Sequence, residues 1–256
     1  MRLSAQQIES FVELGYVVLP GLFDASFVRH CNDKIWRELD ADPEDPSSWP
    51  EEVIQPVPSL EAEFRAISSG VLDEPRAQLL GPDFHRGAGF VPVLNFPRFG
   101  PAEFSPHGFH IDGVGEASLF PKARFLLGFV YCSDVEPDGG AVAVRPGSHR
   151  QIFEHHMRRG TDPAGETDAP EGPDYAPAIP LAGEAGTAFL LHYLLAHGSS
   201  DNRSDRVRVS LNGKTSPSTP YRRRSGRPDG TWTPLDLTLR TDTLTPENPA
   251  LARQFA

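Results

Sequence analysis

Residues 190–210 read LLHYLLAHGSSDNRSDRVRVS. This stretch overlaps two β-rich runs, 187–195 and 206–212, and the polar segment that begins at His197 separates them. In the second run, strand alternation places Arg208 and Ser210 on one face. A guanidinium beside a hydroxyl suits a dicarboxylate ligand, because the planar Arg fork binds a carboxylate through two hydrogen bonds.

A second stretch, FHIDG at residues 109–113, supplies two further groups. In an extended segment, residues two apart point to the same face, so His110 and Asp112 converge while Ile111 points away. Two histidines and one carboxylate form a facial triad on octahedral iron, and they leave three positions open for a bidentate co-substrate and oxygen. An HxD motif alone is a weak signal. With His197 as the third ligand, it predicts a non-haem Fe(II) site.

The rest of the chain predicts helices first and strands afterwards. Ser4 and Gln7 form a capping box for one helix, and Asp24 caps another. Helices are predicted over residues 4–14, 24–39, 59–69, 73–80 and 246–255, with a short strand at 16–19 and a loop at 40–58. Further β-rich runs follow at 91–96, 125–132 and 141–144.

This order predicts one domain over residues 1–256, mainly β with flanking helices and of jelly-roll type. Residues 1–87 would form a helical support and residues 88–215 the jelly-roll core. Residues 158–177 are rich in Gly, Pro, Asp and Glu, which indicates a surface insertion or lid.

Composition narrows the class of partner. The net charge of -11 repels a phosphate-rich partner, so nucleic acid is an unfavourable substrate, and a CoA thioester is disfavoured more weakly. Cys31 and Cys132 belong to no CxxC pair and are interpreted as buried side chains in a reducing compartment. No run approaches the ~18 apolar residues of a membrane span, and the N-terminus lacks a secretory signal. We therefore expect a soluble, cytoplasmic protein, and the sequence leaves its oligomeric state open.

The motifs, taken in order, resemble the phytanoyl-CoA dioxygenase family of Fe(II)/2-oxoglutarate oxygenases. HxD, a distal His followed by Gly-Ser, and an Arg 11 positions after that His are all present. GYVVLPGLF at 15–23 is similar to the family's N-terminal motif, and DGGAVAVRPGSHR at 138–150 to its central PGSH segment. The resemblance covers residues 4–214 and implies a double-stranded β-helix, the cupin-like jelly roll.

The resemblance also implies roles for individual residues. His110, Asp112 and His197 would bind Fe(II), and Arg208 would pair with the distal carboxylate of 2-oxoglutarate. Ser199 matches a family position that touches the same carboxylate.

Two more residues are candidates for contact with 2-oxoglutarate: Ser210, from the Arg-x-Ser arrangement, and Asn95, on the strand before HxD. Arg206 competes with Arg208 for the carboxylate, and the spacing from His197 favours Arg208. His192 is interpreted as a structural histidine.

The implied activity is that of a dioxygenase that uses O2 and oxidises a small molecule, by hydroxylation or oxidative cyclisation. Acidic bacterial members of the family tailor secondary metabolites, which favours a sugar-containing or polyketide intermediate in antibiotic biosynthesis. Related halogenases carry a small residue in place of Asp112, so halogenation is disfavoured here. Two alternatives stay open: a cupin-like metal-dependent isomerase or hydrolase, and a non-catalytic binding homologue.

Overall fold

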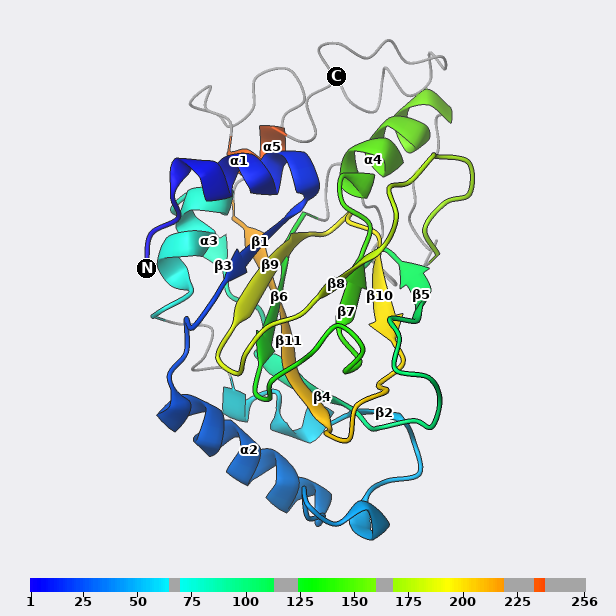
Figure 1. The fold of residues 1–256 in the computed structure, drawn as a ribbon. Coiled ribbons are helices and arrows are strands. Elements are labelled where there is room, and N and C mark those ends of the chain that lie inside the picture. The colour runs from blue at the N-terminus through cyan, green and yellow to red at the C-terminus, as the bar shows by residue number, and fades with distance from the viewer. Residues whose placement is uncertain (65–69, 113–123, 160–167, 219–232, 238–256) are drawn as a thin grey trace.

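The computed structural model describes residues 1–64, 70–112, 124–159, 168–218 and 233–237 (Figure 1). Its helices are α1 (Ala5–Leu14), α2 (Ala25–Leu39), η1 (Pro46–Ser48), η2 (Pro58–Leu60), α3 (Asp73–Leu80), α4 (Ser148–Arg159) and α5 (Pro234–Leu237). Its strands are β1 (Tyr16–Leu19), β2 (Ile54–Pro56), β3 (Phe84–His85), β4 (Phe90–Asn95), β5 (Pro106–His110), β6 (Leu126–Tyr131), β7 (Val142–Val144), β8 (Ile179–Leu181), β9 (Ala188–His192), β10 (His197–Ser200) and β11 (Arg208–Pro217).

The strands form two antiparallel sheets. The larger sheet has the order β1-β9-β6-β11-β4-β2, with β3 paired to β11, and the smaller has the order β5-β10-β7-β8. Helices α1, α3 and α5 gather at one end of the larger sheet, whereas α2 runs along its other end (Figure 1). The predicted jelly roll, mainly β with flanking helices, is confirmed.

Local signals account for the start of the chain. The Ser4 side chain accepts a hydrogen bond from the Gln7 amide, and the Gln7 side chain accepts one from the Ser4 amide, which closes the predicted capping box of α1. Gly15 ends the helix with φ 86°, a left-handed conformation that glycine adopts without strain. The Asp24 side chain accepts from the Phe27 amide at the start of α2.

The buried core includes residues of both sheets and of helices α1, α2, α3 and α4. All six residues of β6 are buried, and the Phe90 ring of β4 packs onto the backbone of its neighbours in the sheet. A Cβ on Gly128 would lie 3.3 Å from that ring, and one on Gly213 would lie 3.0 Å from it. Glycines at these two paired positions therefore let the aromatic ring lie flat against β6 and β11.

Two predicted segments differ from the structure. The predicted loop at 40–58 contains β2, which pairs with the edge of β4. Within its described residues, the predicted helix at 59–69 starts in the 3₁₀ turn η2 and continues as a turn with further 3₁₀ residues at 63–64, with no α-helix. The first 87 residues thus add strands β1, β2 and β3 to the sheet as well as helices. The strand β2 escapes prediction because a short edge strand is stabilised by pairing across the sheet rather than by its own sequence.

The predicted insertion at 158–177 begins inside α4, which ends at Arg159. Further along, Asp168 forms a β-bridge with His110, so part of this segment lies against β5. Its role as a lid stays a prediction, and the helix predicted at 246–255 lies outside the described residues.

The two cysteines, 101 positions apart in sequence, meet in the fold. Both are buried and free, with Cys31 on α2 and Cys132 just after β6. A hydrogen bond with the Cys31 side chain, and then burial, raise the pKa of the Cys132 thiol, so the pair acts as packing between helix and sheet.

In the described part of the chain, no helix combines the length and the apolar character that a membrane span requires.

Candidate metal centre

Two histidines face each other across neighbouring strands of the smaller sheet. His110 is the last residue of β5 and His197 is the first residue of β10, and the two are direct partners in antiparallel register. Their ring centroids lie 4.4 Å apart. The structure thus brings together two side chains that are 87 positions apart in sequence.

Backbone carbonyls orient both imidazole rings. Nδ1 of His110 lies 2.8 Å from the Gly108 carbonyl oxygen, and Nδ1 of His197 lies 2.9 Å from that of Leu195. A ring nitrogen that faces a carbonyl carries the proton, so each Nε2 keeps its lone pair for a ligand. Burial, and then the charge of His110, lower the pKa of His197 to about 4, which keeps this ring neutral at pH 7.

Asp112 completes the cluster from just beyond β5. Its Oδ1 lies 3.7 Å from His110 Nε2, and one ligand atom from each of the three residues falls within 4.8 Å of the others. Neutral imidazoles and a carboxylate are the donor set of non-haem Fe(II). With two correctly oriented Nε2 atoms and one carboxylate, the residues present fit that metal.

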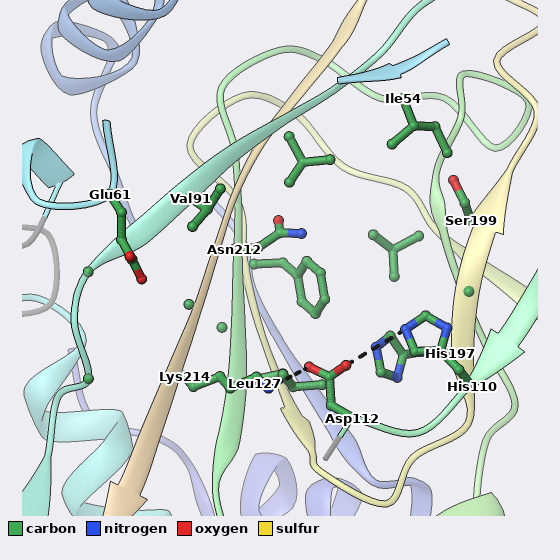
Figure 2. A pocket seen from close by; sticks show the side chains of 18 of the residues that line it. Ile54, Glu61, Val91, His110, Asp112, Leu127, His197, Ser199, Asn212 and Lys214 are labelled. Carbon is green, nitrogen blue, oxygen red and sulfur yellow. Dashed lines mark ion pairs between the residues drawn. The ribbon is translucent and has the colours of Figure 1, made fainter. Parts of the chain in front are cut away.

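A pocket of about 600 Å³ opens between the two sheets at this cluster (Figure 2). This volume is within the range of small-molecule sites. All three predicted metal ligands line it, and so do Ser199 and Arg208. The sequence-predicted residues Asn95 and Ser210 are not part of its wall.

Arg208 carries a buried positive charge at the pocket wall. Its side chain donates one hydrogen bond, 2.8 Å from Nη1 to the Gly140 carbonyl oxygen. Its buried Nε has no hydrogen-bond partner, and Arg208 forms no ion pair within the described part of the chain. Burial lowers the pKa of Arg208, but a guanidinium stays protonated in proteins. An anionic ligand would compensate this charge.

Asn95 acts behind the wall rather than on it. Its amide nitrogen donates to the Ser200 carbonyl oxygen at 2.9 Å and lies 3.4 Å from Ser199 Oγ. Asn95 is also the register partner of Arg208. It therefore ties β10 of the smaller sheet to β4 of the larger one and fixes the position of Ser199.

The remaining sequence candidates have clear places. Ser210 Oγ lies 3.1 Å from both the Val93 carbonyl oxygen and Asn212 Oδ1, so its polar group is used within the sheet. Arg206 lies before β11 with a side chain that is 72% exposed, which leaves Arg208 as the arginine of the pocket.

His192 is fully buried, and its Nδ1 accepts from the Leu194 amide at 3.1 Å. It stands outside the three-residue cluster, as expected of a structural histidine.

Three polar wall residues were missed by the sequence predictions. Asn212 and Lys214 follow Arg208 on the same strand face. Asn212 is the last residue of the predicted strand, whereas Lys214 lies beyond it, because β11 continues to Pro217. Extending the alternation would have found them. Glu61 lies across the pocket from His197 and Ser199 (Figure 2) and comes from the turn after η2, where no sequence pattern indicates a site.

Comparison with known families gives one match. A model of the family described as phytanoyl-CoA dioxygenase (PhyH) matches residues 11–210. Among curated proteins, none matches the chain.

Solved structures of similar fold include SnoK, SnoN and HygX. The non-haem alpha-ketoglutarate-dependent carbocyclase SnoK from nogalamycin biosynthesis has a TM-score of 0.61 and 20% identity, covering 96% of this chain and 93% of SnoK. The epimerase SnoN, in complex with Fe3+, alpha-ketoglutarate and nogalamycin RO, has a TM-score of 0.59 and 19% identity, covering 88% of this chain and 86% of SnoN. HygX from Streptomyces hygroscopicus, with nickel, 2-oxoglutarate and hygromycin B bound, has a TM-score of 0.57 and 17% identity, covering 90% of this chain and 95% of HygX. At these identities the likeness shows the fold.

Proposed function

The chain belongs to the phytanoyl-CoA dioxygenase family and is an Fe(II)/2-oxoglutarate-dependent enzyme, and from this premise we propose that it oxidises a small-molecule secondary metabolite with O2, by hydroxylation or oxidative cyclisation. His110, Asp112 and His197 hold the metal in this proposal, and Arg208 with Ser199 holds the distal carboxylate of 2-oxoglutarate. Bound there, Fe(II) with 2-oxoglutarate supplies the activation of dioxygen that oxidation of an unactivated C–H bond requires.

One observation carries the proposal: a buried Arg208 without an anionic partner among the described residues opens onto the same pocket as the three-ligand cluster. An isolated buried cation is costly, and a bound carboxylate offsets that cost through charge-assisted hydrogen bonds. A metal-dependent isomerase or hydrolase without 2-oxoglutarate would leave this guanidinium with no role. A non-catalytic binding homologue would need neither the ligand set nor the arginine.

In this proposal, the protein's own groups orient the metal ligands and the residues that bind 2-oxoglutarate. The carbonyl oxygens of Gly108 and Leu195 hold the Nδ1 protons of the two histidines, so both Nε2 atoms stay aimed at one point. Asn95 donates to Ser199 Oγ and is the register partner of Arg208, so one residue helps to position both. The apolar side chains of Val93, Phe129 and Val142 keep the pocket wall dry.

The substrate class draws on the relatives of similar fold. SnoK and SnoN belong to nogalamycin biosynthesis and HygX is solved with hygromycin B, which supports a sugar-containing or polyketide intermediate. The wall beyond the metal ligands combines apolar residues such as Val91 and Leu127 with polar Glu61 and Asn212. That mixture suits a molecule with a hydrophobic body and polar substituents.

The test begins without substrate. Anaerobic addition of Fe(II) and then 2-oxoglutarate should produce the weak visible absorption band of a chelated 2-oxo acid. In air, succinate should form when sugar-containing and polyketide intermediates are added one by one, and mass spectrometry then separates gain of oxygen from loss of two hydrogens. Absence of both the band and succinate would overturn the proposal. Turnover that needs neither 2-oxoglutarate nor oxygen would favour the isomerase or hydrolase.

A further inference from the structure

A lysine of the larger sheet contacts one of the three proposed metal ligands. Lys214 lies on β11, six positions after Arg208 and on the same strand face, and it lines the pocket. Its Nζ lies 3.4 Å from Asp112 Oδ2 (Figure 2). Among the described residues, Lys34 is the other lysine. It lies on α2 and pairs with Glu63 at the surface, outside the pocket. Of the two described lysines, Lys214 is therefore the one that pairs with a proposed metal ligand.

The two oxygens of Asp112 face different partners. Oδ1 points to the cluster, 3.7 Å from His110 Nε2, whereas Oδ2 points to Lys214. An ion pair with one oxygen favours the orientations of the carboxylate that keep this oxygen beside the ammonium, which restricts its rotation. The other oxygen is then presented to the metal alone.

Asp112 needs such an external partner. It lies two residues beyond His110, where β5 and its ladder of backbone hydrogen bonds have ended. Lys214 is itself restrained, because its ammonium lies 4.8 Å from the centroid of the buried Phe125 ring, within cation–π range. The larger sheet thus supplies the orientation that the smaller sheet does not give to this ligand.

We propose that Lys214 is a positioning residue that keeps the Asp112 carboxylate monodentate toward the metal. The inference rests on the proposed metal site. A bidentate carboxylate would occupy one of the three positions that a chelating co-substrate and oxygen need. Partners in the outer shell of a metal site change its affinity by about 10–100-fold when they are removed.

Co(II) is a suitable probe, because its visible absorption reports coordination and needs no substrate. We expect Lys214→Met to weaken Co(II) binding by about 10-fold or more and to change the visible spectrum, since the freed carboxylate can rotate. Lys214→Arg keeps a donor for Oδ2 and should restore most of the affinity. Lys34→Met makes the same change at the remote surface pair and should bind Co(II) like the unmodified protein.

The controls separate two kinds of failure. If the unmodified protein binds Co(II) no better than His110→Ala, the proposed metal site itself is wrong. If the unmodified protein binds Co(II) and Lys214→Met binds it equally, with the same spectrum, the positioning role is wrong. The thermal unfolding midpoint of metal-free Lys214→Met should match that of the unmodified protein, because an exposed ion pair contributes little to stability. Loss of folding would be read against Lys214→Arg, whose unchanged fold but unrestored affinity would also overturn the role.

Discussion

His197 and His110 are register partners between β10 and β5, and their ring centroids lie 4.4 Å apart. The pairing means that the same backbone hydrogen bonds that hold the smaller sheet together also set the distance between two proposed metal ligands. The metal site is thus part of the sheet rather than an addition to it.

The first prediction concerns these ligands. His110→Ala should reduce Fe(II) affinity by more than the roughly 100-fold that removal of an outer partner costs, because a direct ligand is lost. The His110 side chain is 40% exposed, so the metal-free variant should stay within about 1 kcal/mol of the parent in unfolding free energy. Titration with Fe(II) under anaerobic conditions measures the first quantity and urea unfolding the second. Undiminished Fe(II) binding would remove His110 from the ligand set.

The second prediction separates the two arginines. Arg208→Met should weaken 2-oxoglutarate binding by about 10- to 150-fold, since a hydrogen bond to a charged group contributes about 1.5–3 kcal/mol. The metal-free variant should be no less stable, because the change removes a buried cation that lacks an ionic partner in the described structure. Arg206→Met is the matched control and should bind 2-oxoglutarate normally. Equal losses in both variants would contradict the assignment of Arg208.

The third prediction concerns the loss of folding stability at acidic pH. Burial lowers the pKa of His149 to about 3, below the usual 6.5 of the unfolded chain. The unfolded state therefore takes up a proton first, and the stability that His149 contributes above pH 6.5 is lost as the pH falls from 6.5 toward 3, at about 1.4 kcal/mol per pH unit. His149→Gln can keep the contact with the Val12 carbonyl oxygen and should flatten this slope by about one proton. Urea unfolding of the metal-free protein and of the variant at pH 7, 6 and 5 gives the two slopes, and equal slopes would contradict the lowered pKa of His149.

The fourth prediction concerns the turn after α1. Gly15→Ala should lower the unfolding free energy by about 2 kcal/mol or more, because φ of 86° costs a non-glycine residue about 1–2 kcal/mol and the new Cβ would lie 2.6 Å from His149 Nδ1. At Gly21 φ is 59° and a Cβ meets nothing within 4 Å, so Gly21→Ala should carry only the backbone cost. Equal losses at the two positions, measured by urea unfolding, would mean that the contact with His149 relaxes freely.

Much of the local structure follows from neighbouring residues. The capping box at Ser4, the cap at Asp24 and the glycine at position 15 predict α1, β1 and α2 close to their observed bounds, because caps and helical periodicity involve residues within one or two turns. The HxD spacing likewise predicts that His110 and Asp112 share a face, since alternation is a property of a single extended strand. The family resemblance supplied the rest of the proposed site.

Local sequence therefore accounts for the chemical groups and their local geometry: two histidines and an arginine in strands, and a carboxylate just after one of them. Only the tertiary structure decided that β10 pairs with β5, that β2 joins the edge of β4, and that Lys214 and Glu61 reach the pocket. These contacts join segments far apart in sequence. Their formation depends on how two sheets pack, and strand pairing of that kind has no signature in the sequence of either partner.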